Sequence, residues 1–401
     1  MSRLTRKDDW TETTLGQIAG LVMGKTPPRN EKKYWTDELT HPFCTIADME
    51  GKWIHPQREG VTSIAIQNAK ARKVAAGSLM MSFKLTIGRV GFAGVELYPN
   101  EAIVAIDVDA NISTKEFLYL VLGSQDLTHG SGRAIKGSTL NSASLAAIPL
   151  LLPPLAEQKR IVDVMASVDN YIVALQQQAV DAQAARNAVL HELLNAGGVD
   201  WAETTLGETV AIIRDRLDPA SCDPAEMLCH WSIPALDETG GPVTVPASHI
   251  GSHKFRVKKN AVAFSLLNPR LPRYVLIQGG ENVVCSTEFA VMQPKSGMDE
   301  SFLYVLASSS EFQKIVGTFA SGTTKSRERV RPADLEHIQI RLPPVSEQRR
   351  IVGIVSAMDN VTGAAQEAVS NAQELRSGLL SELLSGDHEI PETYDRLLGV
   401  A

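Results

Sequence analysis

Two stretches of the chain carry apolar residues in alternating steps of four and three, the pattern of a helix that packs along a narrow seam. One stretch follows Pro153-Pro154 and the other follows Pro343-Pro344. The first seam consists of Ile161, Met165, Val168, Ile172, Leu175, Ala179, Ala182, Arg186, Val189 and Leu193. The second consists of Ile351, Val355, Met358, Thr362, Ala365, Val369, Ala372, Arg376, Leu379 and Leu383. The pattern predicts two long helices packed as an intramolecular coiled coil. The alternative is that each helix covers only its own domain.

The chain is internally duplicated. The phrase "LPPLAEQKRIV", which begins at Leu152, returns as "LPPVSEQRRIV" from Leu342. "WTETTLG" from Trp10 likewise returns as "WAETTLG" from Trp201, and "LHELL" returns as "LSELL". Between these anchors the copies differ: "GSLMMSFKLTIGRVGF" has only a loose counterpart in "NAVAFSLLNPRLPRYV". A duplication without functional meaning is one interpretation. A shared framework with divergent middles favours the other, in which both middles do the same job on different targets.

Each middle has the pattern of a mixed α+β domain. Short apolar runs bounded by Gly, Pro and Asn predict strands in "SLMMSF", "RVGFAGV" and "AIVAIDV", and in "AVAFSLL", "RYVLI", "NVVCS" and "FAVMQ". One helix is predicted in each middle, over residues 114–127 and residues 299–316. Each middle should end in a strand directly before its Pro-Pro pair.

Charge changes the picture only when it is mapped by segment. The 401 residues carry a formal net charge of −7, which by itself argues weakly against a nucleic-acid partner. Residues 52–92, however, hold seven basic residues and one acidic residue, and residues 253–274 hold six basic residues and no acidic one. A phosphate backbone responds to the local potential, so both middles could present a basic face.

The composition indicates a cytoplasmic protein. The first residues, "MSRLTRKDDW", lack an apolar signal segment, and no run approaches the roughly 20 apolar residues that span a bilayer. Four cysteines in a chain of this length do not form a disulfide framework, which fits a reducing compartment.

The doubled phrase "LPPLAEQKRIV", followed in each copy by "LHELL" or "LSELL", resembles the specificity subunit of type I restriction–modification enzymes. The string "MSFKLTIGRVGF" and the early "GKTPPRNEKKYW" also look like one class of target-recognition domain in that family. The resemblance covers essentially the whole chain and implies two target-recognition domains that each read one half of a split DNA sequence. It also implies two spacer helices, which hold the domains apart and dock methylation subunits. The second recognition domain matches the family less closely.

The expected fold is therefore α+β, with two tandem recognition domains separated by two long helices that form an antiparallel coiled coil with pseudo-twofold symmetry. We expect the first recognition domain at residues 1–151, the first spacer helix at 152–197, the second recognition domain at 198–341, the second spacer helix at 342–386 and an acidic tail at 387–401.

Enzymatic functions are not supported by the motifs. The nearest strings to a methyltransferase signature are "NPRL" at Asn268 and "GFAG" at Gly91, and both lack required residues. "GSGRAIKGST" has the composition of a phosphate-binding loop, but its lysine precedes the glycine. Cys222, Cys229 and His230 do not have zinc-site spacing. We expect a non-catalytic subunit without cofactor or metal, whose partners are duplex DNA, two copies of a methylation subunit and a restriction subunit. A protein–protein scaffold is the alternative.

Basic residues in the two middles are the candidate DNA ligands. Arginine can bind guanine through two hydrogen bonds, whereas lysine mostly contacts phosphate. The candidates are Lys84, Arg89, Arg133 and Lys136 in the first domain, and Arg270, Arg273, Lys325, Arg327 and Arg329 in the second.

Two arginines interrupt the seams at core-facing positions. In a parallel pair, Arg186 and Arg376 would meet in one layer, where like charges repel. In an antiparallel pair, Arg376 comes level with Asp169 and Arg186 with Asp359. We therefore expect antiparallel helices with these two ion pairs, which would also fix the register. The alternative is that both arginines extend along the seam edge to water.

Overall fold

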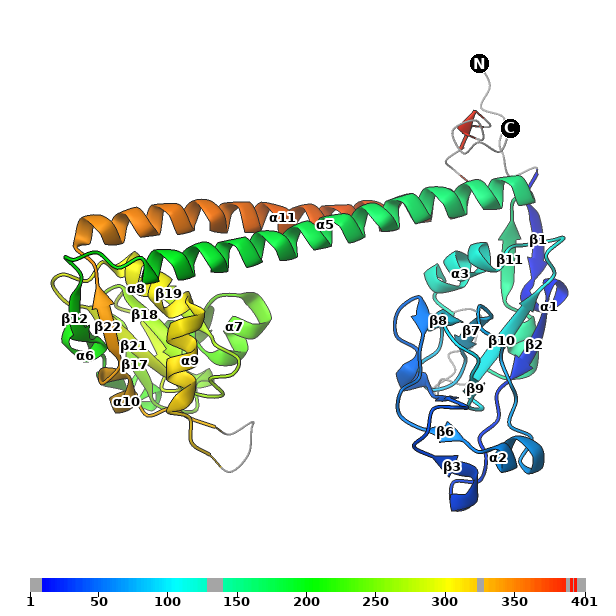
Figure 1. Ribbon diagram of the computed structural model, residues 1–401, viewed down its shortest axis with the longest axis horizontal. Helices are drawn as coiled ribbons and strands as arrows, with labels where there is room; N and C mark the ends of the chain where they lie inside the picture. The colour runs from blue at the N-terminus through cyan, green and yellow to red at the C-terminus, as the bar shows by residue number, and fades with distance from the viewer. Residues whose placement is uncertain (1–8, 128–139, 323–327, 387–389, 392, 395–401) are drawn as a thin grey trace. The chain divides into compact units, whose positions relative to one another are not determined.

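A computed structural model describes residues 9–127, 140–322, 328–386, 390, 391, 393 and 394. The chain divides into two compact units, one formed by Met1–Ala174 with Ser370–Ala401 and the other by Leu175–Val369. Both units combine β-sheets with helices, as the sequence predicts (Figure 1). The division falls within both long helices, so each unit contains one part of each helix.

The first unit is built on a five-stranded sheet in the order β2-β10-β7-β8-β5. Its strands are β2 (Ala19–Met23), β5 (Trp53–Ile54), β7 (Leu79–Ser82), β8 (Val90–Ala93) and β10 (Ile103–Val108). Two-stranded sheets join β1 (Thr11–Thr14) to β11 (Pro149–Leu152), β3 (Trp35–Thr36) to β6 (Gly60–Val61), and β4 (Phe43–Cys44) to β9 (Tyr98–Pro99). The helices are α1 (Leu15–Ile18), α2 (Ser63–Asn68), α3 (Lys115–Ser124) and α4 (Ser142–Ala146). Phe117 and Leu118 of α3 share a core with Leu79 and Phe92 of the sheet.

The second unit contains a four-stranded and a five-stranded sheet. The first has the order β13-β21-β18-β19, with β13 (Val210–Ile212), β18 (Ala261–Ser265), β19 (Tyr274–Ile277) and β21 (Phe289–Pro294). The other has the order β14-β17-β20-β15-β16, with β14 (Arg216–Leu217), β15 (Met227–Trp231), β16 (Val243–Pro246), β17 (Lys254–Arg256) and β20 (Val283–Ser286). A pair joins β12 (Ala202–Thr205) to β22 (Gln339–Leu342). The helices are α6 (Leu206–Thr209), α7 (Ile233–Thr239), α8 (Glu300–Ser308), α9 (Ser310–Thr318) and α10 (Pro332–Glu336).

All seven predicted strands are present, but one helix prediction was wrong. The single helix expected over residues 299–316 is two helices, α8 and α9, which meet at Ser309. Ser309 has extended backbone angles, and its side chain accepts a hydrogen bond from the Phe312 amide at 3.2 Å. Serine is a favoured N-cap because its oxygen satisfies an amide that has no intrahelical partner, so the serine run ends one helix and begins the next.

The two long helices are α5 (Leu155–Asn195) and α11 (Val345–Ser385), each 41 residues long. In the first unit residues 155–174 of α5 accompany residues 370–385 of α11, so the start of one helix lies with the end of the other. The second unit shows the reverse combination, with the end of α5 and the start of α11. The helices are therefore antiparallel within each unit, as predicted. Every predicted seam residue is buried or half-buried.

The repeated phrases pair with one another in space. "WTETTLG" forms β1, which runs antiparallel to β11, the strand that leads into the first Pro-Pro. "WAETTLG" forms β12, which pairs in the same way with β22. After each pair the chain enters a long helix, and Gln158 or Gln348 donates its backbone amide to the carbonyl of the second proline. The repeated sequences thus form a pair of antiparallel strands that leads into the start of a long helix. We call this strand pair the frame.

A buried glutamine in each long helix locks this frame to the domain. The Gln158 side chain accepts from the Ser113 hydroxyl at 2.8 Å and from the Thr114 amide at 3.2 Å. It donates to the carbonyls of Ile112 and Pro153 at 3.0 and 2.9 Å. Thr114 is also the N-cap of α3, so the glutamine ties the first turn of α5 to the start of α3.

Gln348 makes the equivalent bonds in the second unit. Its side chain accepts from the amide of Asp299, the N-cap of α8, at 2.7 Å. It donates to the carbonyls of Gly297 and Pro343 at 2.7 and 2.8 Å. Both glutamines are fully buried, so their polar atoms have exchanged water for these partners. The glutamine of the repeated phrase is therefore the joint between each long helix and its domain.

We predict that replacing either glutamine with leucine destabilises its unit. Gln158→Leu or Gln348→Leu leaves a buried amide and buried carbonyls without a partner, which costs about 2–4 kcal/mol. Gln177→Leu is the matched control, because Gln177 is exposed on α5 and, within the described part of the chain, bonds to Asp181 of its own helix. Urea unfolding of the full chain measures the difference. If both buried-glutamine variants unfolded at the wild-type urea midpoint, the glutamines would not stabilise the link between helix and domain.

Candidate nucleic-acid interface

Each unit has a hairpin loop closed by the same hydrogen bond. In the first unit the loop joins β7 to β8, and the Ser82 amide donates to the Arg89 carbonyl at 2.9 Å. In the second unit the loop joins β18 to β19, and the Ser265 amide donates to the Arg273 carbonyl at 2.8 Å. The two serines are both fully buried and the two arginines occupy equivalent ends of the loops. We call residues 83–88 and residues 266–272 the recognition hairpins.

A distant segment contacts each recognition hairpin at the same place. The Leu140 amide donates to the Phe83 carbonyl at 3.0 Å, and the Val330 amide donates to the Leu266 carbonyl at 3.0 Å. In the second unit Leu267 also forms a bridge with Arg329, and the Asn268 amide donates to the Glu328 carbonyl. The fold therefore brings the region before the long helix next to the hairpin in both copies.

In the first unit, Lys84 and Arg89 flank the recognition hairpin. Arg89 is exposed, and its guanidinium donates to the Ile46 carbonyl at 3.2 Å, which fixes its direction. The Lys84 ammonium lies 5.4 Å from the centre of the Phe83 ring. These two sequence candidates therefore lie at one hairpin, and the Lys84 ammonium also attracts the Glu101 carboxylate.

The three described arginine candidates of the second unit all form ion pairs. Arg270 contacts Glu328 at 2.9 Å and Arg329 contacts Glu288 at 2.8 Å, and both arginine side chains remain more than half exposed. Arg273 binds both carboxylate oxygens of Asp237, at 2.6 and 2.8 Å, and its side chain is only 18% exposed. This bond lowers the pKa of Asp237 from its ordinary value. Arg270 and Arg329 are thus the accessible cations, while Arg273 is held within the domain.

A groove of about 430 Å³ adjoins the second recognition hairpin. It is lined by Pro269, Arg270, Pro272 and Glu328 from the hairpin side and by Ser310, Gln313, Lys314, Gly317 and Ala320 around α9. Two cations, an amide, a hydroxyl and one carboxylate line this groove, and Arg270 pairs with the carboxylate of Glu328. Such a set of donors can bind phosphate or base edges once Arg270 exchanges Glu328 for a nucleic acid.

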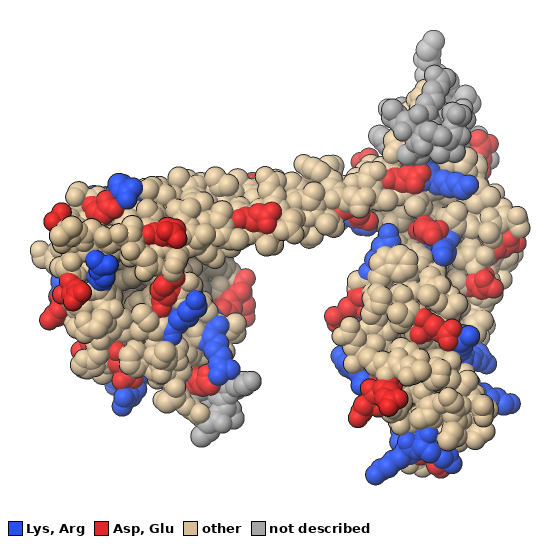
Figure 2. All heavy atoms as spheres, in the orientation of Figure 1, with Lys and Arg blue, Asp and Glu red and all other residues tan. Residues whose placement is uncertain are grey.

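Neither unit presents a surface of a single sign on the face shown in Figure 2. Lysine and arginine atoms alternate with carboxylates, as the ion pairs require. Four of the sequence candidates, Arg133, Lys136, Lys325 and Arg327, lie outside the described residues.

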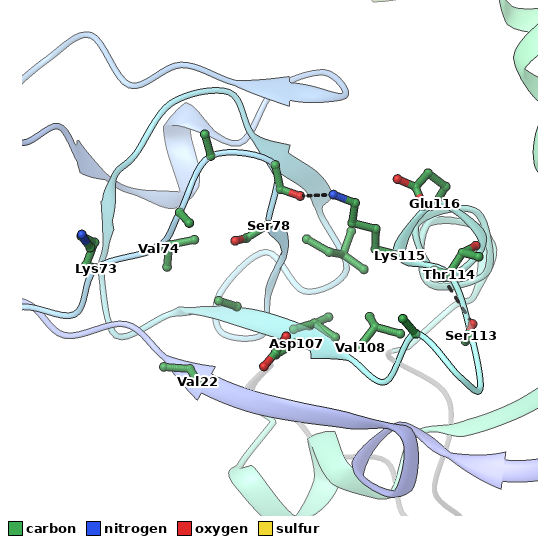
Figure 3. Close-up of a pocket in the computed structure, with 17 residues that line it drawn as sticks. Val22, Lys73, Val74, Ser78, Asp107, Val108, Ser113, Thr114, Lys115 and Glu116 are labelled. Carbon is green, nitrogen blue, oxygen red and sulfur yellow. Dashed lines mark hydrogen bonds between the residues drawn. The ribbon is translucent and has the colours of Figure 1, made fainter.

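A second cavity, of about 550 Å³, lies between β2, β7, β10 and the start of α3 in the first unit (Figure 3). Its two lysines already bind the protein: the Lys115 ammonium donates to the Gly77 carbonyl at 2.9 Å, and Lys73 pairs with Glu96 at 3.2 Å. Ser113 is held by Gln158. We assign no ligand to this cavity.

Other chemistry is not indicated by the described part of the chain. It holds no cluster of three or more metal-ligating side chains. Cys229 and His230 are neighbours on β15, and burial together with Lys254 lowers the pKa of His230 to about 4, so the imidazole is neutral. Among the helices described, none has the length and apolarity needed to cross a membrane.

The paired helices contain both arginine–aspartate pairs that the seam register predicts. Arg186 donates to Asp359 at 2.8 Å and also to the buried hydroxyl of Ser308 at 3.0 Å. Arg376 donates to both carboxylate oxygens of Asp169. The first pair lies in the second unit and the other pair lies in the first.

The two pairs differ in their surroundings. Position 123, the counterpart of Ser308, is a glycine, so Arg376 has no equivalent hydroxyl. Arg376 and Gly123 instead line a cavity of about 560 Å³. Arg186 is therefore the more buried of the two arginines.

The residues at the tips of the recognition hairpins were not predicted from the sequence. Leu85 and Asn268 both have a positive φ, of 62° and 50°, although neither is glycine. They occupy the same place, three residues after the buried serine that begins each loop. The strings "SFKL" and "SLLN" contain these two residues, but their letters do not reveal the backbone conformation. Only the backbone angles distinguish Leu85 and Asn268 from their neighbours.

The structure defines a class of protein: an internally duplicated chain of two units, each with an equivalent hairpin on the same frame. The family model for the type I restriction modification DNA specificity domain matches residues 7–182 and 245–372, so the chain belongs to this family.

Individual relatives are more distant. The type I restriction enzyme MjaIX specificity subunit of Methanocaldococcus jannaschii is 24% identical over 170 residues, which are 41% of this chain and 39% of that protein. The aligned part is thus well under two thirds of the relative. A chain from a solved structure of "complex assembly" and "conformational transition of the type I R-M system" is 16% identical. It has a TM-score of 0.63, with 94% of this chain and 97% of that chain covered, and supports the fold. The HsdS subunit from Thermoanaerobacter tengcongensis has a TM-score of 0.47 at 18% identity, with coverage of 95% and 97%.

We predict measurable coupling within each helix ion pair. In a double-mutant cycle, Arg186→Met and Asp359→Asn should show a coupling energy of about 1 kcal/mol, since the arginine is buried while the aspartate is partly exposed. Arg376→Met with Asp169→Asn should behave similarly. The exposed pair of Arg350 and Glu347, three residues apart on α11, is the control and should couple less. A coupling energy indistinguishable from zero in both cross-helix cycles would show that these ion pairs do not fix the register of the two helices.

Proposed function

We propose that the protein is the non-catalytic DNA-recognition subunit of a type I restriction–modification enzyme. It reads a split duplex target, one half with each unit, and directs associated methylation and restriction subunits to that target. Residues 1–151 and 198–341 are the proposed recognition domains, and residues 152–197 and 342–386 are the helices that connect them. The family membership and the similarity to curated specificity subunits support this proposal.

The main support for the proposal is that the two units share the same framework but carry different hairpin loops. Both units close the hairpin with the same serine–arginine bond, and in both a buried glutamine ties the long helix to a domain helix. The loop residues themselves differ in charge, shape and length. This is the arrangement that a protein needs if two domains perform the same binding reaction on two different sequences.

Within this proposal the exposed arginines and lysines bind DNA. Lys84 and Arg89 act in the first unit, and Arg270 and Arg329 act in the second, where DNA phosphate replaces the carboxylates of Glu328 and Glu288. Arg273 would first have to break its ion pair with Asp237, so we assign it a smaller role in DNA binding. Arg133, Lys136, Lys325 and Arg327 remain candidates on their sequence position alone. The DNA target and the four free cysteines favour a cytoplasmic location.

Duplex binding should depend steeply on salt, because each phosphate contact releases counterions and adds about 0.9 to the slope of log affinity against log salt. Arg270→Ala and Arg329→Ala should each lower the magnitude of this slope by about 1. Arg350→Ala is the control, as Arg350 is an equally exposed arginine paired within α11. Fluorescence anisotropy of the full chain with a duplex, from about 50 to 200 mM salt, makes the measurement. A flat slope would favour the protein–protein scaffold instead.

We also propose that the protein binds two methylation subunits. The duplication gives each unit the same strand pair and the same glutamine joint, so a partner that recognises one copy should recognise the other. Native mass spectrometry of the co-expressed subunits should show two methylation subunits for each copy of this chain. A one-to-one complex at saturating methylation subunit would refute the second site.

A further inference from the structure

The first recognition hairpin presents a leucine in an unusual way. Leu85 has a φ of 62°, in the left-handed region that glycine and asparagine tolerate but a leucine side chain disfavours. Its side chain is 80% exposed, although the neighbouring Phe83 is buried. Both features oppose stability: the backbone is strained, and a large apolar side chain stays in water.

The hairpin holds this leucine in place. The buried Ser82 hydroxyl donates to the Thr86 carbonyl at 2.5 Å and accepts from the Arg89 amide at 3.0 Å. The Gly88 amide donates to the Ser82 carbonyl at 2.9 Å. Ser82 thus braces both sides of the loop, so Leu85 projects from a fixed backbone between Lys84 and Arg89.

The second unit has an asparagine at the same place. Asn268 follows Ser265 by three residues, as Leu85 follows Ser82, and its φ is 50°. One backbone position with the same left-handed conformation therefore carries an apolar group in one unit and an amide in the other. These two groups suit different bases: an apolar side chain contacts the thymine methyl group, and an asparagine can bind adenine through two hydrogen bonds.

We propose that this hairpin position determines specificity in both halves of the target, with Leu85 contacting a thymine methyl group and Asn268 binding an adenine. The inference rests on the proposed function, because it requires that the hairpins approach bases. Lys84 and Arg89 hold the phosphates on either side while Leu85 reaches the base edge. Contact with DNA removes the exposed Leu85 side chain from water, which offsets the backbone strain that the brace maintains.

The test uses the full chain co-expressed with its methylation and restriction subunits, and sequences the methylated motif in the host genome. Leu85→Gly and Leu85→Asn both remove the apolar group while their backbones accept the left-handed conformation. Each variant should keep or raise the melting temperature of the full chain. Leu85→Gly should also reduce discrimination by on the order of tenfold at one A·T position in one half of the motif, and Leu85→Asn should shift the preference at that position from thymine towards adenine.

Matched variants separate this effect from a general loss of binding. Val95→Ser removes another exposed apolar side chain, at the opposite end of β8 from the hairpin, and should leave the motif unchanged. Asn268→Gly should relax one A·T position in the other half only.

The outcomes distinguish the inference from the function it rests on. An unchanged split motif in the Leu85 variants, relaxation at a G·C position, or a lowered melting temperature would overturn the assignment of Leu85 while leaving the proposed function intact. A wild-type protein that directs no split motif at all would instead overturn the proposed function.

Discussion

The buried side-chain amide of Gln158, repeated as Gln348, is the interaction on which the rest of the arrangement depends. An amide can donate and accept at once, and here it satisfies the N-cap amide of a domain helix together with two backbone carbonyls. A glutamate could not donate and a leucine could do neither, so few residues fit the place. Because the glutamine belongs to the first turn of the long helix, it fixes where each helix begins relative to its own domain.

Around these joints, the duplicated frame and the variable loops obey different constraints. The strand pairs formed by the repeated phrases must match the long helices, so their sequences stay similar. The recognition hairpins end in solvent, and their residues can change as long as the closing serine–arginine bond is kept. The copies also differ beside the helices, where Ser308 supports Arg186 but Gly123 leaves a cavity at Arg376. Symmetry is therefore a property of the frame and not of every surface.

Periodicity and repetition predicted most of the frame. The seam positions, the antiparallel direction and the strands were accessible because each depends on regular spacing or on a charge that must find a partner. The break at Ser309 was missed because a local capping bond overrode an apolar pattern that continues through it. The internal ion pair of Arg273 was also unpredictable, since Asp237 lies 36 residues away in the chain. The left-handed conformation of Leu85 could not be predicted either. It depends on the hydrogen bonds of Ser82 and not on the conformational preference of leucine.

The central claim is that each unit reads one half of a split target independently of the other. Exchanging residues 1–151 for the corresponding part of a family member with a different target tests it directly, with both long helices and the second domain left in place. Sequencing the methylated bases in cells that express the hybrid should show one half of the motif replaced and the other half retained. A motif that changes in both halves, or in neither, would contradict the account.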